Sequence, residues 1–558
     1  MTLNDDDRNL LRNEVTARKS RGAFFTPERI ANYLAEWAIG EKIDPVVLDP
    51  TCGDGELLHA AGLILKRVPG NLSTASRQLV GVDVHATSLL AARVRLATAG
   101  IEPTLHLSDF FAVTAPNIPG NHLIGSVDAV VGNPPFIRFH LHVGDLRDRA
   151  NDAAAQQGVA LNGRASSWAA ALVHASGFLK PDGRLAMVLP AELLSVDYAE
   201  PVRRWLLLRF GHVEIITFHQ RQFSDASADV ILLLASGTGG TNKIGIRSVQ
   251  DANDLSVLAA SHQIVRAPAS GKWTGLALPP NTQNAYKRAR SYFDRLGDVA
   301  KVHLGTVTGA NKFFALSEDQ RKKWGLEESD VTAMMPSGSR GLRGATFTAS
   351  DWDLLRQSGA RVWLFRPDPL QMSSSAERYL QEGLRLGVNE TYKSRVRPSW
   401  WAVPVSPVPD FFFSYMAHNH VRIVQNEAKV GYFNSLLGVT AKGNANLQGL
   451  HLLAMNSATL LASELMGRSY GGGVLKLEPG ELSNLWVPKP ATFARVRERV
   501  LPIAASLEAK LRIGEWEHVV RRMDDILLVE KLSMPPHDVS LIRSGRRLMQ
   551  ASRQEKSN

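Results

Sequence analysis

The sequence predicts an α/β protein whose first half contains a seven-stranded, mostly parallel open sheet. Over about residues 20–240, short apolar runs typical of buried strands alternate with segments whose apolar residues recur at helical spacing. Small flexible residues then gather at 236–240, and helical periodicity dominates again from about residue 490. We therefore expect a first domain, a connecting region, a mixed α+β domain and a helical segment with a frayed basic tail, over residues 1–240, 241–295, 296–490 and 491–558.

The composition excludes several classes of protein. The chain has 558 residues, a formal net charge of +10 and a pI near 9.6. Its one cysteine, Cys52, excludes an intrachain disulfide and indicates a reducing compartment. The sequence has neither a secretion signal nor an apolar run of the roughly 18 residues that cross a membrane, so we expect a cytoplasmic protein. The excess of positive charge favours a polyanionic partner such as nucleic acid.

The first predicted element is a helix that begins near Thr26. Thr26 is a favourable N-cap, Pro27 suits the first helical position and Glu28 lies in the first turn. The helical pattern continues through Ala38. The Phe24-Phe25 pair before it is more apolar than a helix start requires, which leaves room for a lip that covers a ligand.

The first predicted strand, residues 45–48, leads into the glycine-rich turn Asp49-Pro50-Thr51-Cys52-Gly53-Asp54-Gly55, and a helix starts at Glu56. A strand, a glycine turn and a helix in this order form a nucleotide-type cradle. The turn lacks the lysine of a phosphate loop, and its acidic residues would repel a pyrophosphate. The ligand is therefore expected to be neutral or cationic at this end, and S-adenosylmethionine meets that requirement.

Acidic and aromatic residues also end the next two strands. Asp83 follows residues 79–82, at the position where a ribose diol is usually bound. Asp109 and Phe110 follow residues 104–107. Asp109 can accept a hydrogen bond from an adenine amino group, and Phe110 can stack on the ring.

The fourth strand, residues 127–130, runs into Asn133-Pro134-Pro135-Phe136, which we call the catalytic loop. Proline fixes φ and lacks an N–H, so the Asn133 amide and the Pro134 carbonyl are held in one rigid geometry. Ligands of open α/β sheets bind at the carboxyl ends of the strands, so four such strand ends predict one site along that edge. Three further strands complete the sheet, at residues 184–189, 213–218 and 230–234. No helix separates the last two, so we expect antiparallel neighbours.

These motifs resemble those of the class I S-adenosylmethionine-dependent methyltransferases, which have a Rossmann-like fold. Among them, the sequence is similar to the γ class of DNA adenine-N6 methyltransferases, such as the TaqI-like type II modification enzymes, because Phe25-Thr26-Pro27 precedes the glycine turn and a long segment follows the catalytic part. The resemblance implies cofactor-binding roles for Phe25, Thr26, Asp49, Thr51, Gly53, Gly55, Asp83, Asp109, Phe110, Asn133 and Pro135. It implies catalytic roles for Asn133, Pro134 and Phe136, and stacking of a flipped-out base on Phe136 and Phe223.

The catalytic loop has the groups that methylation of an adenine amine requires. This amine is a poor nucleophile because its lone pair conjugates with the ring. The Asn133 side-chain oxygen and the Pro134 carbonyl can each accept one N6–H, which draws the nitrogen toward tetrahedral geometry. Phe136 can stack on the base once it has left the duplex, for about 1–3 kcal/mol. No metal is needed, and double-stranded DNA is the expected partner.

The second half places basic residues beside glycine turns and aromatics, a pattern typical of a surface that follows DNA phosphates. Residues 305–314 and 468–477 resemble stretches of the family's recognition domain, and residues 392–401 interleave basic and aromatic side chains. The candidate DNA contacts are Arg138, just after the catalytic loop, and Lys312, Lys393, Arg395, Arg397, Arg468 and Lys476. For at least one of Trp400 and Trp401, a place in the core is the favoured interpretation.

Other interpretations stay open. An amino-methyltransferase acting on RNA or on a protein glutamine would use the same loop, and a DNA-binding specificity subunit without activity would share the second half. Pro409-Asp410 and Glu427-Ala428-Lys429 match a loose nuclease pattern that would make the chain a fused restriction–modification enzyme, although this pattern often arises by chance. A separate restriction endonuclease is a candidate partner, and a monomer is compatible with the sequence.

Overall fold

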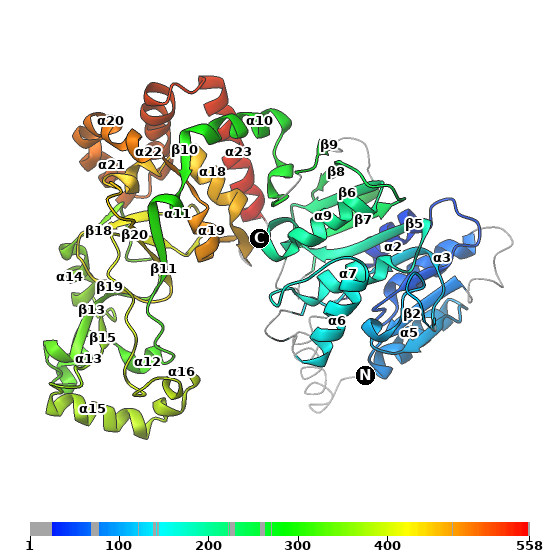
Figure 1. Cartoon of the computed structure of the whole chain (residues 1–558), viewed down its shortest axis with the longest axis horizontal. Coiled ribbons are helices and arrows are strands. Elements are labelled where there is room, and N and C mark those ends of the chain that lie inside the picture. The colour runs from blue at the N-terminus through cyan, green and yellow to red at the C-terminus, as the bar shows by residue number, and fades with distance from the viewer. Residues whose placement is uncertain are drawn as a thin grey trace, which may run out of the picture. The chain divides into compact units, whose positions relative to one another are not determined.

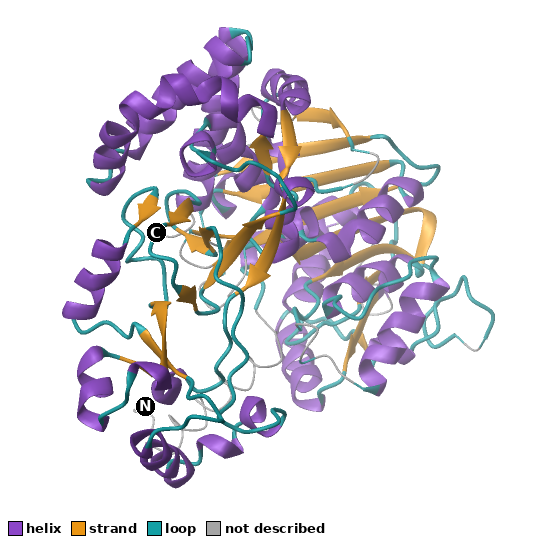
Figure 2. Ribbon diagram, turned by 60° about the vertical axis from the view of Figure 1, so that its left-hand side comes forward, coloured by secondary structure: helices purple, strands orange, loops and turns teal. Residues whose placement is uncertain are grey.

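The computed structural model shows a chain of two compact units (Figures 1 and 2). The first contains Met1–Ala277, Tyr470–Gly473 and Ser552–Asn558, and the second contains Leu278–Ser469 and Val474–Ala551. The structure describes residues 25–67, 78–120, 122–137, 141, 144–220, 222–223, 229–256, 263–268, 271–470 and 473–555. In these ranges no helix is both long enough and apolar enough to span a membrane.

Nine strands form one sheet in the first unit, in the order β3-β2-β1-β4-β5-β7-β6-β8-β9. Their bounds are Val47–Asp49 (β1), Leu79–Asp83 (β2), Thr104–Leu107 (β3), Val127–Gly132 (β4), Leu179–Pro190 (β5), His212–Phe218 (β6), Val230–Ser236 (β7), Lys243–Val249 (β8) and Gln263–Arg266 (β9). Neighbours from β3 to β5 are parallel, as are β6 and β8, whereas β7 is antiparallel to β5 and β6, and β9 to β8. The predicted α/β class and the predicted antiparallel pair are confirmed.

The prediction of seven strands was wrong. The additional strands, β8 and β9, lie in the stretch 241–295, which we expected to be a connecting region. Arg247 of β8 is 4 % exposed, and its guanidinium donates to Glu214 of β6 and to the Tyr33 hydroxyl, both at 2.6 Å. The ion pair occupies an interior position that normally holds an apolar residue, so the period-two pattern of a strand is interrupted.

Helices cover both faces of this sheet (Figure 2). Helices α2, α3 and α5 pack on one face, and α6, α7 and α9 on the other. Successive residues of a strand point to opposite faces, so Val131 joins the first layer and Val130 the second. The bounds are Glu28–Ile39 (α2), Glu56–Arg67 (α3), Ala86–Thr98 (α5), Asp145–Gln156 (α6), Ser167–Ser176 (α7) and Glu200–Arg209 (α9). The shorter helices are Phe110–Ala112 (η1), Glu192–Ser195 (α8), Asp197–Ala199 (η2), Ala252–Ser256 (η3) and Thr274–Ala277 (η4).

Smaller sheets are built from strands of the second half of the chain, in the orders β10-β23, β11-β20-β16-β18-β14, β12-β15-β13-β19 and β17-β22-β21. Their bounds are Phe293–Arg295 (β10), Ala300–Leu304 (β11), Ala315–Leu316 (β12), Val331–Met335 (β13), Thr346–Phe347 (β14), Trp363–Phe365 (β15), Phe411–Ser414 (β16), Met416–Ala417 (β17), Ile423–Asn426 (β18), Gly431–Tyr432 (β19), Leu436–Ala441 (β20), Arg468–Tyr470 (β21), Val474–Lys476 (β22) and Trp486–Pro488 (β23). This part is mixed α+β, as predicted.

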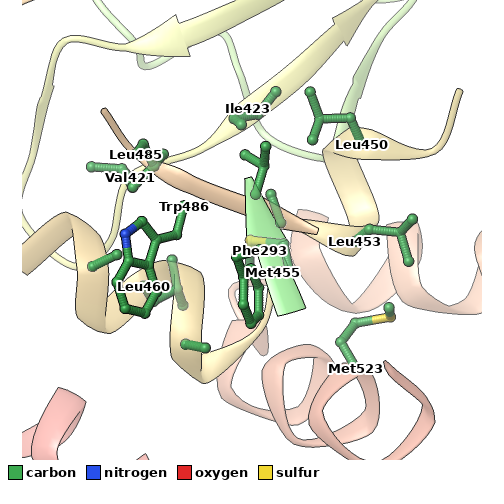
Figure 3. Packing of buried hydrophobic residues seen from close by; sticks show 14 of the residues in the cluster. Phe293, Val421, Ile423, Leu450, Leu453, Met455, Leu460, Leu485, Trp486 and Met523 are labelled. Carbon is green, nitrogen blue, oxygen red and sulfur yellow. The ribbon is translucent and has the colours of Figure 1, made fainter. Parts of the chain in front are cut away.

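The main core of the second unit lies between these strands and the surrounding helices (Figure 3). Trp486 stacks on Tyr286 with ring centroids 4.1 Å apart, and Phe293 and Met523 pack in the same cluster. The helices before residue 490 are Pro280–Ala289 (α10), Arg290–Tyr292 (η5), Leu296–Val299 (α11), Asn311–Phe314 (α12), Glu318–Trp324 (α13), Glu328–Asp330 (η6), Ala349–Gln357 (α14), Ser374–Arg385 (α15), Val388–Glu390 (η7), Tyr392–Arg395 (α16), Leu450–Leu453 (α17), Ser457–Met466 (α18) and Pro479–Ser483 (α19).

Helices dominate from Pro490 onward, as predicted. Their bounds are Pro490–Val500 (α20), Leu501–Ile503 (η8), Ala504–Arg512 (α21), Trp516–Met523 (α22), Asp524–Lys531 (η9, a π-helix) and Pro536–Glu555 (α23). The expectation of a frayed basic tail was wrong for α23, because its arginines are paired. Arg543 contacts Asp524 at 3.0 Å, and the buried Arg546 contacts Glu517 at 2.6 Å.

Candidate active site at the carboxyl edge of the parallel strands

The glycine-rich turn after β1 forms an open cradle. Asp49 is buried and accepts a hydrogen bond from the Thr51 amide at 3.1 Å, and burial raises the pKa of Asp49 to about 8. Gly55 has φ +81°, and a Cβ there would lie 2.9 Å from that of Ala92, so only glycine lets α5 approach. A Cβ on Gly53 would meet no atom of the described residues within 4 Å, so the turn is open on that side.

Asp83, at the end of β2, is tied directly to this cradle. One carboxylate oxygen accepts from the Gly53 amide at 3.0 Å, and the other accepts from the His85 amide at 2.8 Å. A carboxylate oxygen can accept two hydrogen bonds, so each keeps capacity for a diol hydroxyl. The predicted ribose-binding residue therefore lies next to the glycine turn.

Asp109 and Phe110 lie at the end of β3, but largely inside the protein. Asp109 caps η1 through the Phe111 amide at 3.1 Å and accepts from Arg149 of α6 at 2.9 Å. Phe110 is 4 % exposed, and its ring packs 4.7 Å from that of His174. Arg149 and His174 are neighbours that sequence reasoning missed, because both come from helices that follow β4.

The structure ties Thr26 to the catalytic loop. The Asn133 Nδ2 donates to Thr26 Oγ1 at 3.2 Å, across 107 residues of sequence. The prediction that Thr26 caps the first helix was wrong, because Pro27 occupies the N-cap position and no side chain caps it. The Thr26 hydroxyl instead accepts a hydrogen bond from the Asn133 amide. Because the Nδ2 and Oδ1 atoms of an amide point in different directions, this hydrogen bond sets the direction in which Asn133 Oδ1 points.

The predicted aromatic residues Phe136, Phe223 and Phe25 differ in how far they are exposed. Phe136 is half-buried and packs at the edges of the apolar clusters on both sheet faces. Phe223 is 5 % exposed and belongs to one of these clusters, so the structure brings both stacking candidates into the same packing layer. Phe25, just before Thr26, is 54 % exposed, as a covering lip requires.

The candidate DNA contacts divide into two groups. Lys312, Lys393 and Arg395 are exposed. The remaining described candidates make contacts within the protein: Arg397 with the carbonyls of Val307 and Thr308 at 3.0 and 2.6 Å, Arg468 with Glu481 at 2.9 Å, and Lys476 with Glu478 at 2.8 Å. Arg138 lies outside the described residues. Trp400 packs against Phe313 and Phe314, in agreement with the core interpretation.

The structure shows where the residues of the loose nuclease pattern lie. Asp410 accepts from the Ala441 amide at 3.0 Å, Glu427 is exposed, and Lys429 occupies a turn with φ +53°. Among the residues that the structure describes, no group of three or more His, Cys, Asp or Glu side chains could hold a metal ion. We therefore assign no chemistry to this pattern.

The cradle fits S-adenosylmethionine. The Thr51 hydroxyl is buried and has no hydrogen-bond partner among the described residues, so it can accept one from a ligand. The open side of Gly53 adjoins Asp83, whose carboxylate suits a diol. The sheet order and this series of strand ends define a class I S-adenosylmethionine-dependent methyltransferase.

Comparisons with known proteins agree with this class. Residues 9–247 match the N-6 DNA methylases, and residues 270–528 match the C-terminal domain of the type II methyltransferase M.Eco57I. The first part of the chain thus resembles the N-6 DNA methylases, and the second part resembles the M.Eco57I C-terminal domain. The predicted family and cofactor are thereby confirmed.

Individual relatives span most of the chain. It is 22 % identical to the type II methyltransferase M.AccI of Acinetobacter calcoaceticus over 487 residues, and 24 % identical to M.XamI of Xanthomonas campestris pv. amaranthicola over 484 residues. Both alignments cover 84 % of this chain and 85 % of the relative. The DNA-bound type IIL restriction–modification enzyme MmeI shares the fold, with a TM-score of 0.56 and 11 % identity over 97 % of this chain and 76 % of that one.

Proposed function

We propose that this DNA methyltransferase transfers a methyl group from S-adenosylmethionine to N6 of an adenine that has been flipped out of duplex DNA. The observation that carries the proposal is the catalytic loop itself. An amide, a proline carbonyl and an aromatic ring follow β4 directly, and the Asn133 amide is oriented by Thr26 at 3.2 Å. Two acceptors beside a stacking ring suit a planar base that carries an NH₂ group.

The residues of this chain would bind the base and prepare its amine. Asn133 Oδ1 and the Pro134 carbonyl would each accept one N6–H, and their partial negative charges would stabilise the positive charge that develops on the nitrogen. Phe136 would stack on the flipped base and compensate for the stacking lost in the duplex. Because both acceptors are rigid before the substrate arrives, little reorganisation is needed when charge develops.

The cofactor would be held by the cradle. Thr51, the amides around Gly53 and the Asp83 carboxylate would contact its nucleoside and amino-acid parts, and Asp109 would bind its adenine. Bound S-adenosylmethionine supplies a methyl group on a positively charged sulfur. The role of the protein is to orient the two reactants and exclude water, which accounts for much of the rate enhancement in such transfers.

The distribution of charge supports DNA as the substrate. Residues 278–551 contain 36 Lys and Arg against 26 Asp and Glu, whereas residues 1–277 contain 26 and 27. The second unit therefore accounts for the whole net charge of +10, while the unit with the cofactor cradle is close to neutral. An excess of positive charge favours sequence-independent binding to DNA phosphates. Because the relatives are type II methyltransferases, we place the activity in a restriction–modification system with a separate endonuclease.

Tritiated S-adenosylmethionine tests the proposal. The purified protein is incubated with duplex DNA, with RNA and with protein, and labelled DNA is digested to nucleosides and separated. We expect label in DNA alone, and there in N6-methyldeoxyadenosine. Label in 4-methyldeoxycytidine would exclude adenine as the target, and label in RNA or protein would support the alternative substrates. Asn133→Ala is expected to abolish transfer while equilibrium dialysis still detects cofactor binding.

A further inference from the structure

One buried serine outside the four strand ends contacts the catalytic loop through both its side chain and its backbone. Ser167 is the first residue of α7 and is 3 % exposed. Its hydroxyl accepts from the Ile137 amide at 3.0 Å and donates to the Pro135 carbonyl, and its own amide donates to the Ile137 carbonyl at 3.1 Å. A hydroxyl can donate and accept at once, so this one side chain satisfies both a backbone N–H and a backbone carbonyl.

These three hydrogen bonds bracket Phe136. The Pro135 carbonyl precedes it, and the amide and carbonyl of Ile137 follow it, so the backbone on either side of the ring is held by the same residue. Buried backbone groups are rarely left unsatisfied, and a loop with two consecutive prolines has few donors of its own. Ser167 therefore constrains the backbone on both sides of the stacking ring.

The start of α7 is itself firmly anchored, so the serine is a rigid support. Trp168, the next residue, is fully buried, and its indole N–H donates to the Tyr198 hydroxyl at 3.1 Å. Tyr198 in turn donates to Glu192 at 2.7 Å. Glu192 opens α8 directly after β5, the neighbour of the strand that carries the catalytic loop. A chain of side-chain hydrogen bonds thus links the start of α7 to the end of β5.

We propose that Ser167 is a positioning residue for methyl transfer, which holds Phe136 and the Pro134 carbonyl in the geometry that receives the target base. The inference rests on the proposed function, because it concerns the same loop. In this role Ser167 would touch neither the base nor the cofactor. It acts through the Pro135 and Ile137 backbone, so its loss is expected to affect the bound base and the rate of transfer, and to leave cofactor affinity unchanged.

The test compares Ser167→Ala with Ser176→Ala. Ser176 is equally buried in the same helix, and its hydroxyl donates only within the helix, to the Val173 carbonyl at 2.8 Å. Single-turnover methylation of duplex DNA, fluorescence of 2-aminopurine at the target position, cofactor affinity and thermal unfolding are measured for both variants. Removing two side-chain hydrogen bonds is expected to slow transfer by about 5- to 160-fold in Ser167→Ala, with a changed 2-aminopurine signal and cofactor affinity within about twofold.

The outcomes separate this inference from the proposed function. If the wild type and Ser176→Ala do not label DNA, the proposed function fails. If they do, and Ser167→Ala is equally fast, the positioning role is wrong. It is also wrong if Ser167→Ala loses cofactor affinity as strongly as rate, because the serine would then support the whole site. Ser167→Thr keeps the hydroxyl and is expected to recover most of the rate; a well-folded Ser167→Thr as slow as Ser167→Ala would contradict the role of the hydroxyl.

Discussion

Thr26→Val probes the contact that orients the catalytic amide. Valine has nearly the shape of threonine, but it lacks the hydroxyl that accepts from Asn133 Nδ2 at 3.2 Å. Without that acceptor, the amide loses its preference for the orientation in which Oδ1 faces the target amine, and only the correctly oriented fraction is competent. A net hydrogen bond contributes about 0.5–1.5 kcal/mol, so the single-turnover rate is expected to fall about 2- to 13-fold.

Cofactor affinity decides between the two roles considered for Thr26. The resemblance implies that this residue binds the cofactor, whereas the structure shows a contact with the catalytic amide. Isothermal titration with S-adenosylmethionine is expected to give an affinity within about twofold of the wild type, and Thr26→Ser, which keeps the acceptor, is expected to retain the rate. An unchanged rate in Thr26→Val, or a loss of affinity that accounts for the whole loss of rate, would refute the reasoning.

Two further predictions concern stability and DNA binding. Burial raises the pKa of Asp49 from 3.8 to about 8, so its contribution to stability is complete below pH 3.8 and is lost as the pH rises toward 8, where the folded protein would bury a charge. Asp49→Asn is therefore expected to gain in Tm over the wild type between pH 5 and 8 in thermal scans, and parallel curves would contradict the raised pKa. Lys393→Ala and Arg395→Ala remove exposed cations, and each is expected to weaken DNA binding uniformly across sequences and to reduce the salt slope of the binding constant by about 1. Arg468→Ala, which removes a cation already paired with Glu481, serves as the comparison, and an equal change in slope there would mean that the exposed pair has no special role.

The sheet was predictable where local pattern and burial agree. β1, β2 and β4 follow buried apolar runs closely, and the polar ends of β1 to β4 share one edge because parallel strands bring their carboxyl ends together. β8 was missed because Arg247 is buried with Glu214, and a charged residue in a strand interior obscures the alternation. Such a pair is visible only once β6 and β8 are known to be neighbours.

Side-chain roles were less predictable than strand positions, because they depend on partners distant in sequence. Thr26 has the chemistry of an N-cap, yet it serves Asn133, 107 residues away. Arg397 has the charge of a DNA contact, yet two loop carbonyls occupy its guanidinium. Ser167 has no motif around it, and its importance comes from facing a loop 30 residues earlier. Residue type indicates what a side chain can do, and the fold selects which partner it meets.

The hydrogen bonds that Ser167 and Thr26 make with the catalytic loop also bear on the order in which the chain folds. The contact with Ser167 closes a span of 30 residues, whereas the contact with Thr26 closes one of 107. Loop-closure entropy makes the longer contact costlier by about 1 kcal/mol, so the amide is expected to reach its final orientation after the backbone of the loop is set. A partly folded chain with α2 undocked would then present Phe136 correctly but leave the Asn133 amide without its orienting contact. The full rate of methylation would thus depend on a contact that forms late in the folding of the first unit.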